Sequence, residues 1–222
     1  MTQIIAAVQE KGGVGKSMIL CALAAHLAED GLSVAIVDTD PQATCAHWVA
    51  AGDVAVDIVP CLDEDRIADV LDAVAERHRA VLIDTAGYKS AMAIYAVQWA
   101  DTVLVPMAPA MPDARGAIAV WRHVENAARA ARRTVTPRVV LNQVNERAAI
   151  TTKVRAAIDA VAMPVLDTRL PQLTGFREML SRGGPPRGKA RKAFAGLVAE
   201  LRGDGLLDRR RTAAAERETA DV

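Results

Sequence analysis

The stretch Lys11-Gly12-Gly13-Val14-Gly15-Lys16-Ser17 decides the fold, because it ends in the Gly-Lys-Ser of a phosphate-binding loop. An apolar run at residues 4–8 precedes it, and a helical pattern over residues 16–29 follows it. Glycines between a strand and a helix let backbone N–H groups converge on phosphate oxygens. Glu10 stands where the general pattern has its first glycine, and a second lysine, Lys11, comes directly after it. The sequence therefore predicts a nucleotide site of an unusual kind.

Strand and helix patterns alternate along the rest of the chain, which is typical of a parallel sheet. Apolar runs predict buried strands at residues 4–8, 34–37, 56–59, 80–84, 102–106, 138–142 and 165–166. Helical patterns cover residues 16–29, 64–77, 90–99, 114–131, 151–161, 175–181 and 189–202. The expected fold class is α/β, a mostly parallel twisted sheet flanked by helices on both faces and carrying a phosphate loop. We expect a single domain over residues 1–202 and a flexible tail over residues 203–222.

Three aspartates stand at or just after the carboxyl ends of predicted strands, where ligands bind in such sheets. Asp84 ends an apolar strand, the usual context of an aspartate on the metal side of a phosphate site. Asp38 and Asp40 close an earlier strand, and the proline after them indicates that the chain is already turning. One of this pair can then face Mg²⁺ while the other orients the attacking water. In the loop, Lys16 would contact the β- and γ-phosphates and Ser17 would bind Mg²⁺.

The composition argues against several classes of protein. No apolar run reaches the roughly 18 residues that a membrane span requires, and the first strand does not resemble a signal peptide. The cysteines Cys21, Cys45 and Cys61 show no metal-ligand spacing, so we expect them to be buried and reduced in a cytoplasmic protein. Aromatic residues make up 3% of the chain, so Ala, Val, Leu and Ile must build the core.

The net charge of zero hides an asymmetry between the two halves of the chain. Residues 1–114 hold 6 Lys/Arg and 16 Asp/Glu, whereas residues 115–222 hold 21 and 11. The carboxyl half, with its net charge of +10, would suit non-specific and salt-sensitive binding to double-stranded DNA. Scarce aromatics argue against recognition of single strands, and no helix-turn-helix module precedes the loop, so base readout is not expected. The alternative, given equal weight, is that the opposite charges pair within one globule.

The last predicted helix, residues 189–202, carries an apolar stripe with its basic residues elsewhere. The stripe consists of Ala190, Ala193, Phe194, Leu197, Val198 and Leu201. We expect it to pack on the core. A helix that lies on a membrane surface is the alternative, although the stripe is modest in bulk.

Three segments resemble the deviant Walker ATPases of the ParA/MinD superfamily. They are residues 11–17, residues 38–42 (Asp-Thr-Asp-Pro-Gln) and residues 81–87 (Val-Leu-Ile-Asp-Thr-Ala-Gly). Within that superfamily the chain is similar to small ParA-type partition proteins that lack an amino-terminal DNA-binding domain. Trp48, and residues 170–172 (Leu-Pro-Gln) leading into Phe176-Arg177, carry this narrower resemblance. The resemblance covers about residues 1–200.

The resemblance implies an enzyme that binds ATP or ADP with Mg²⁺, hydrolyses ATP slowly and forms a homodimer around the nucleotide. The catalytic residues would be Lys11, Lys16 and Asp40. Lys11 would reach the phosphates of the partner subunit, like an arginine finger supplied in trans, and Asp40 would position the water. Asp38 and Asp84 would serve the magnesium shell together with Ser17. The nucleotide would contact Lys11, Gly12, Gly13, Val14, Gly15, Lys16, Ser17 and Met18, with Pro106 and Asn142 near the adenine.

Two positions depart from the superfamily pattern. Met18 stands where a second Thr or Ser is usual, so a hydroxyl contact is lost and we expect lower nucleotide affinity. Glu10 places a carboxylate beside the loop, where it would repel phosphates if it pointed inward. We expect Glu10 to point outward or to pair with a lysine or arginine.

The function implied by the resemblance is partition of plasmid or chromosomal DNA, or positioning of another cargo. The ATP-bound dimer would coat nucleoid DNA, and a small adaptor bound to a centromere or cargo would stimulate hydrolysis and release. One alternative is an accessory ATPase for DNA transfer similar to VirC1-type proteins, and another is a membrane-positioning ATPase similar to MinD. A metabolic ligase of the same superfold is also open, whereas an iron–sulfur reductase lacks cysteines at the expected positions.

Overall fold

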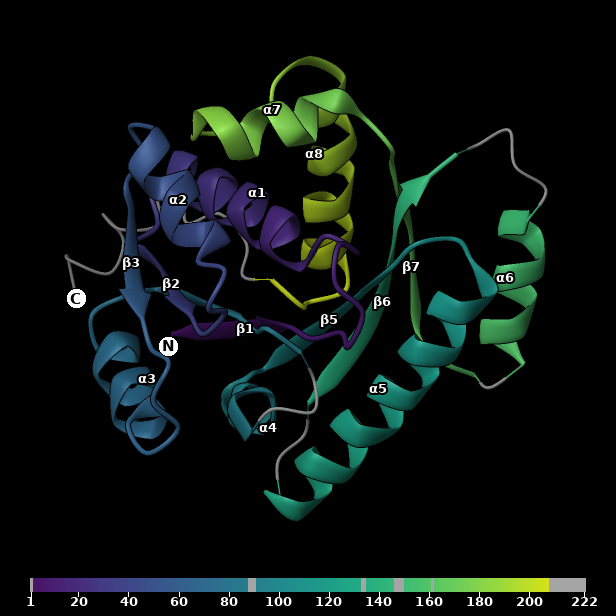
Figure 1. Cartoon of the computed structure of the whole chain (residues 1–222), viewed down its shortest axis with the longest axis horizontal. Coiled ribbons are helices and arrows are strands. Elements are labelled where there is room, and N and C mark those ends of the chain that lie inside the picture. The colour runs from purple at the N-terminus through teal and green to yellow at the C-terminus, as the bar shows by residue number, and fades with distance from the viewer. Residues whose placement is uncertain (1, 88–90, 133–134, 146–149, 161, 208–222) are drawn as a thin grey trace, which may run out of the picture.

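The computed structural model describes residues 2–87, 91–132, 135–145, 150–160 and 162–207. In these residues, seven strands form one parallel sheet in the order β3-β2-β4-β1-β5-β6-β7 (Figure 1). The strands are β1 (Gln3–Ala7), β2 (Val34–Asp38), β3 (Val56–Pro60), β4 (Ala80–Asp84), β5 (Thr102–Met107), β6 (Thr136–Val144) and β7 (Val165–Pro171). The prediction of a parallel α/β sheet is confirmed.

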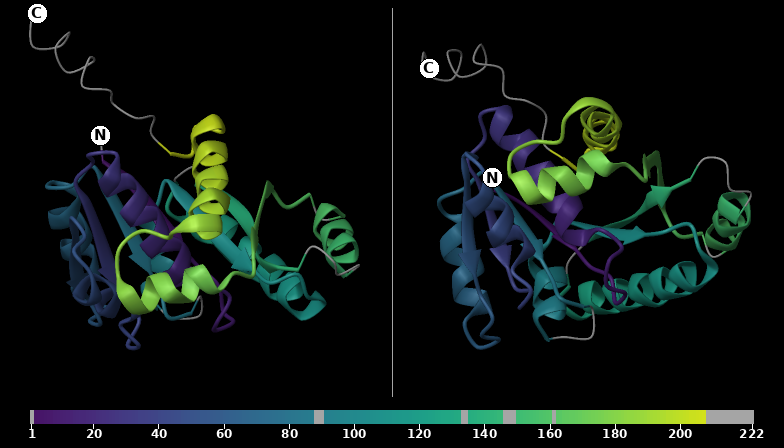
Figure 2. Two further views of the ribbon diagram at one scale, coloured as in Figure 1. Left: turned by 90° about the horizontal axis from the view of Figure 1, so that it is seen from above. Right: turned by 45° about the horizontal axis from the view of Figure 1, so that its top comes forward.

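Helices cover both faces of the sheet (Figures 1 and 2). On one face lie α1 (Lys16–Glu29), α2 (Thr44–Ala51), α7 (Thr174–Arg182) and α8 (Gly188–Gly203), which share one apolar cluster. On the other face lie α3 (Ile67–Ala75), α4 (Ala91–Trp99), α5 (Met111–Ala130) and α6 (Ile150–Asp159), which share a second cluster. Strands β2 and β4 are therefore buried at every position, which explains why they read as continuous apolar runs.

Helix α2 is not predicted by the sequence. Ala43, which precedes its first turn, makes no side-chain cap, so the usual local signal of a helix start is missing. A distant residue takes over this task, because the Ala46 N–H donates a hydrogen bond of 3.2 Å to Oδ2 of Asp38. The helix thus depends on the strand end that carries one of the predicted site residues.

Strand β7 is longer than predicted, running to Pro171 rather than ending at Leu166. The polar residues Asp167 and Thr168 break the apolar run, but their N–H groups donate to the carboxylate of Glu200 on α8. This anchorage lets the strand continue. The extension brings Pro171 to the carboxyl edge of the sheet, where the other strand ends meet.

The predicted domain boundary at residue 202 is too early. Leu206 and Leu207 are buried in the core. The Leu206 carbonyl also accepts hydrogen bonds from Nε2 of Gln3 (2.8 Å) and Oγ1 of Thr102 (3.1 Å). The rest of the expected tail, residues 208–222, lies outside the described residues, so its flexibility stays a prediction.

Helix α8 packs on the core with the apolar stripe expected of it, since Phe194, Leu197 and Leu201 are all buried. Across the described ranges, no helix has the length and apolar character needed to cross a membrane. Cys21, Cys45 and Cys61 are buried and free, in agreement with the sequence-based prediction.

Candidate nucleotide-binding site

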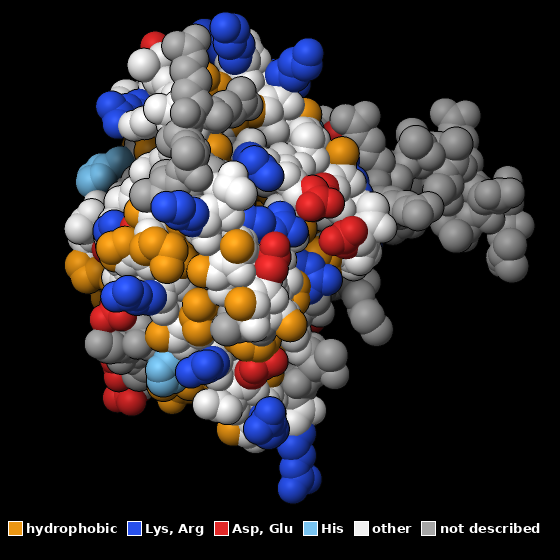
Figure 3. Space-filling model, turned by 90° about the vertical axis from the view of Figure 1, so that its right-hand side faces the viewer, with side chains coloured by type: hydrophobic (Ala, Val, Ile, Leu, Met, Phe, Trp, Pro, Cys, Tyr) orange, Lys and Arg blue, Asp and Glu red, His pale blue; other side chains and the backbone are white. Residues whose placement is uncertain are grey.

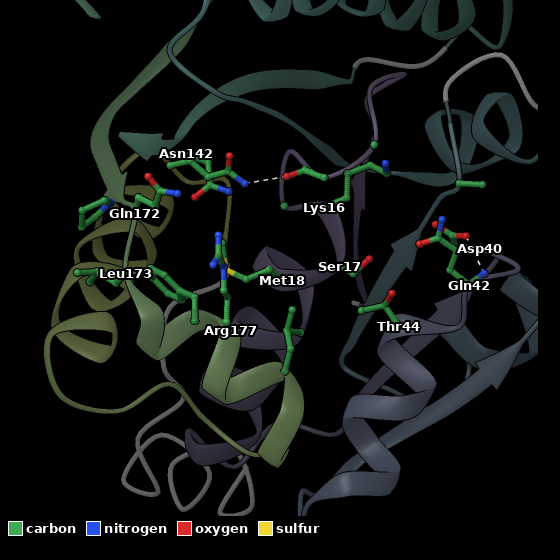
Figure 4. Close-up of a pocket in the computed structure, with 18 residues that line it drawn as sticks. Lys16, Ser17, Met18, Asp40, Gln42, Thr44, Asn142, Gln172, Leu173 and Arg177 are labelled. Atoms are coloured by element: carbon green, nitrogen blue, oxygen red, sulfur yellow. Dashed lines mark hydrogen bonds between the residues drawn. The ribbon is translucent and has the colours of Figure 1, made fainter. Parts of the chain in front are cut away.

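A pocket of about 400 Å³ opens at the carboxyl edge of the sheet (Figure 4). The phosphate loop and the first turn of α1 form its middle, the start of α2 closes one end, and the ends of β6 and β7 with α7 close the other. Its lining residues are Gly12, Gly13, Gly15, Lys16, Ser17, Met18, Asp40, Gln42, Thr44, Ala86, Asn142, Gln143, Pro171, Gln172, Leu173, Phe176, Arg177 and Leu180. The predicted loop residues Gly12, Gly13, Gly15, Lys16, Ser17 and Met18 therefore meet Asp40 and Asn142 in one cavity, whereas Val14 is buried outside the lining.

The shape of the loop is fixed by side chains from β6. Gly15 has a φ of 101°, and a Cβ there would collide with the amide of Asn142, so only glycine fits. Asn142 Nδ2 donates to the Val14 carbonyl, and Gln143 Nε2 donates to the Gly13 carbonyl, both at 2.7 Å. With two carbonyls held in this way, the loop can turn its N–H groups toward a phosphate. Asn142 thus supports the loop, and its contact with adenine stays a prediction.

Lys16 begins α1 and carries its side chain in the pocket, where the residue is 7% exposed. Burial lowers the pKa of Lys16, while the charges of Asp84 and Asp40 act in the opposite direction. A desolvated ammonium gains most from a strongly charged oxyanion. The position and environment of Lys16 therefore suit a phosphate group.

Asp84 ends β4 beneath the loop and is fully buried. Its Oδ2 accepts a hydrogen bond from the Cys45 thiol at 3.2 Å, whereas its Oδ1 has no full hydrogen bond from any described residue. Burial raises the pKa of Asp84 to about 6, although the nearby Ser17 hydroxyl and the Cys45 thiol favour the charged form. An unsatisfied buried carboxylate oxygen beside a serine hydroxyl suits a cation or a water bound to one.

The residues present fit Mg²⁺ that arrives with a nucleotide. Within the described residues, no group of three or more His, Cys, Asp or Glu side chains could hold a metal ion. Mg²⁺ commonly uses one or two carboxylates and takes its other ligands from phosphates and water. The Ser17 hydroxyl and Oδ1 of Asp84 are the protein oxygens that match this demand.

Asp38 and Asp40 diverge, as the sequence predicts for two acids at a turning strand end. Asp38 is 2% exposed, and its two oxygens accept from the N–H groups of Asp40 and Ala46, each at 3.2 Å. Burial raises its pKa. Asp40 instead lines the pocket, with Oδ1 accepting from the Gln42 N–H at 2.9 Å. Asp38 therefore holds the turn that presents Asp40, and a place for it in the magnesium shell stays a prediction.

Lys11 is not part of the pocket lining. Its Nζ lies 2.8 Å from Oδ2 of Asp113, an acid in the first turn of α5 that is buried and that the sequence does not single out. No local signal could have found this contact, because an aspartate in a first turn usually serves the helix dipole. Glu10 is exposed, as expected of an outward-pointing side chain.

The side of the pocket formed by the end of β7 and by α7 consists of residues to which the sequence assigns no role in the site. These are Pro171, Gln172, Leu173, Phe176, Arg177 and Leu180. The strand-end rule would have found the first two if β7 had been predicted at its full length. Pro106, expected near the adenine, is buried on β5 outside the lining, and its carbonyl accepts from Gln9 Nε2 at 3.2 Å.

The charges of the two halves pair in part. Arg191 lies 2.9 Å from Glu29, and Arg202 pairs with Asp30, so α8 is joined to the end of α1. Other basic residues stay exposed, among them Arg115, Arg122, Arg129, Lys153, Arg169, Lys189 and Lys192. Figure 3 shows Lys and Arg side chains spread over one face among a few acids. Pairing within one globule therefore accounts for part of the charge asymmetry, and a DNA-binding surface stays a proposal.

Comparison with known proteins adds to this geometry. Residues 5–186 match the model of the CobQ/CobB/MinD/ParA nucleotide binding domain. The protein ParA of Rhizobium radiobacter is 26% identical over 185 residues, covering 82% of this chain and 83% of its own. The maintenance of carboxysome distribution protein A of Halothiobacillus neapolitanus is 29% identical over 177 residues, covering 78% and 81%.

Among solved structures, the chain is similar to the septum site-determining protein MinD of Pyrococcus horikoshii OT3, complexed with Mg-ADP. The TM-score is 0.75 with 22% sequence identity, and the likeness covers 92% of this chain and 98% of that one. At this identity the comparison bears on the fold, and it agrees with the parallel sheet and its layers.

Proposed function

Because the chain belongs to the family of the CobQ/CobB/MinD/ParA nucleotide binding domain, we propose that it is an ATPase that positions DNA or another cargo. The observation that carries this proposal is the meeting of Lys16, Ser17 and Asp40 in one pocket above the buried carboxylate of Asp84. A relative named for the maintenance of carboxysome distribution, beside one named ParA, supports cargo positioning over metabolic synthesis. The cargo itself is set by an adaptor protein.

The loop, Lys16, Ser17 and the three aspartates would have distinct tasks in hydrolysis. The loop N–H groups and Lys16 bind the phosphates, which fixes the γ-phosphate near Asp40. When bound, Mg²⁺ supplies positive charge at the phosphates, and Ser17 with Asp84 would hold it there. Asp40 orients a water for attack and accepts its proton or a hydrogen bond from it. Asp38 keeps the Asp40 turn in place through its bonds to the backbone.

Lys11 makes the site depend on a second subunit. It begins the loop but lies outside the pocket lining, and its side chain is 57% exposed, so it is accessible to a facing copy of the chain. A cation donated across such an interface stabilises charge on the phosphates of the other subunit. ATP would therefore join two subunits, and hydrolysis would release them.

The dimer would bind double-stranded DNA through exposed basic residues of the carboxyl half. Their positive charge suits contacts with phosphates, which carry no sequence information and weaken with salt. An adaptor on the cargo would speed hydrolysis and so detach the protein from the DNA. Release is then timed by the cargo.

The test is retention of the protein on a DNA-coated surface at low salt with ATP, ADP or no nucleotide. We expect retention with ATP, loss with ADP, and loss with ATP when salt is raised from 50 to about 200 mM. Lys16→Ala is the control that should behave as the nucleotide-free protein under all conditions. Equal retention in the three nucleotide states would show that DNA binding is not switched by ATP.

A further inference from the structure

Arg177 is a charged residue of the pocket that has no partner among the described residues. It stands on α7, is exposed, and in Figure 4 its side chain extends from the helix into the pocket toward Met18. Its backbone carbonyl accepts a hydrogen bond from the Ser181 hydroxyl, which leaves the guanidinium unused. By contrast, Arg182 on the same helix donates to the Pro185 carbonyl at 2.8 Å. The guanidinium of Arg177 is thus free to meet a ligand.

The two ends of the pocket differ in chemistry, which fixes how a nucleotide must lie. Lys16, Ser17 and Asp40 provide the charged end, where the β- and γ-phosphates belong. Leu173 lies at the other end beside Gln172 and offers an apolar surface that suits a base (Figure 4). The α-phosphate and the ribose must then cross the middle of the pocket. Figure 4 shows Met18 and Arg177 in this middle part.

On the α1 side of this middle part, no described side chain donates a hydrogen bond to an anion. Met18 carries a thioether, which is a weak acceptor and no donor, so α1 contributes only backbone N–H there. Lys16 and Arg177 are the two cationic side chains that line the pocket within the described residues. Since Lys16 belongs to the β- and γ-phosphates, Arg177 remains for the α-phosphate.

We infer that Arg177 binds the α-phosphate of the nucleotide and takes the place of the hydroxyl contact that Met18 cannot make. The inference rests on the proposed nucleotide function. A planar guanidinium can give two parallel hydrogen bonds to phosphate oxygens, which lysine cannot. Arg177 is therefore a substrate-binding residue contributed by α7, far along the chain from the phosphate loop.

The experiment measures Mg²⁺-dependent binding of ADP and of the two diastereomers of adenosine 5′-O-(1-thiodiphosphate), in which sulfur replaces one α-phosphate oxygen. Arg177→Ala should weaken ADP binding by roughly 10- to 100-fold, as expected for loss of a charge-assisted contact. Arg177→Lys should bind ADP with an affinity between that of the wild type and that of Arg177→Ala. The wild-type protein should prefer one diastereomer, and this preference should shrink in Arg177→Ala. The matched control is Arg187→Ala, an exposed arginine outside the pocket, which should bind as the wild type does.

Three results would overturn the inference, and they differ in what else they affect. If folded Arg177→Ala binds ADP as tightly as the wild type, Arg177 has no role in binding and the proposed function stands. If the variant keeps its diastereomer preference but loses preference for ADP over GDP, Arg177 contacts the base instead. If neither the wild type nor Arg187→Ala binds ADP, the proposed function fails together with the inference. Because Arg177 is exposed, its replacement should leave the thermal unfolding midpoint unchanged, which checks the fold.

Discussion

The Lys11 ammonium lies 2.8 Å from Oδ2 of Asp113, and this ion pair joins the phosphate loop to the first turn of α5. The lysine side chain is 57% exposed, whereas that of the aspartate is 1% exposed. Oδ1 of Asp113 has no hydrogen-bond partner among the described residues, so Lys11 and the helix N-terminus stabilise its charge. An ammonium has three donors, so its bond to Asp113 leaves Lys11 with less capacity to bind the phosphates of another subunit. The proposed contact of Lys11 with a second subunit would therefore compete with this pair.

Asp113→Asn tests this competition, because it keeps the shape of the side chain and removes its charge. The variant should form the ATP dimer more readily, with a dissociation constant lower by on the order of tenfold, which corresponds to about 1.4 kcal/mol. Analytical ultracentrifugation with ATP measures this, in an Asp40→Ala background that prevents turnover. Lys11→Ala should abolish the gain. A weaker dimer in Asp113→Asn would mean that Asp113 orients Lys11 for its task.

Lys16→Ala should bind ATP and ADP at least about 100-fold more weakly, because it removes the buried cation at the β- and γ-phosphates. Isothermal titration calorimetry measures the change. Lys189→Ala, an exposed lysine outside the pocket, is the matched control and should bind normally. If Lys16→Ala binds nucleotide with an affinity within about threefold of the wild type, Lys16 does not contact the phosphates.

Asp40→Ala should keep ATP bound but slow hydrolysis by about 100-fold or more, since a positioned proton acceptor contributes factors of this size. The dimer should consequently stay on DNA. Phosphate release measures turnover, and Asp53→Ala, which removes an exposed aspartate outside the pocket, provides the comparison. Normal hydrolysis in Asp40→Ala would show that another group orients the water.

Local patterns predict the part of the site that local backbone geometry builds. Glycines and the following helix place Lys16 and Ser17, and the observed bounds of α1 agree with the prediction. The parallel-strand rule also brings two acids together, because Asp38 and Asp84 are direct neighbours in the register of β2 and β4. These features follow from chain direction and residue type alone.

Contacts between distant segments lie beyond such rules. The Lys11–Asp113 pair spans 102 positions, and neither residue carries a sign of the other. The full length of β7 is not predicted, because polar residues interrupt its apolar pattern. Glu200, which accepts a hydrogen bond from the Asp167 N–H, lies 33 positions away in the sequence. Pro106 stands near the carboxyl end of β5 but is buried outside the pocket lining, and its place near the adenine stays a prediction. The sequence thus identifies the phosphate end of the pocket and misses the opposite end.

The raised pKa of Asp84 predicts a pH dependence of stability. Asp84 has a pKa of about 6 in the folded protein, against an ordinary value of 3.8. Between these values the folded state binds more protons than the unfolded chain, so the free energy of unfolding falls as the pH rises from about 4 to about 6. One pKa unit corresponds to about 1.4 kcal/mol, which gives a loss of up to about 3 kcal/mol. Above about pH 6, Asp84 is charged in both states, so its contribution to the free energy of unfolding no longer changes with pH.

Asp84→Asn isolates this contribution, because asparagine is neutral at every pH. Asp38, whose pKa is also raised by burial, is present in both proteins and so does not account for a difference between them. Without nucleotide or Mg²⁺, the variant should match the wild type near pH 4 and exceed its free energy of unfolding at pH 7. Urea unfolding at several pH values measures this, with the exposed Asp53→Asn as the control. Mg²⁺ with ATP should reverse the order at pH 7, since a cation stabilises the buried carboxylate and cannot do so for the amide. A difference between the two proteins that does not change with pH would contradict the assignment of Asp84 as a buried, titrating carboxylate.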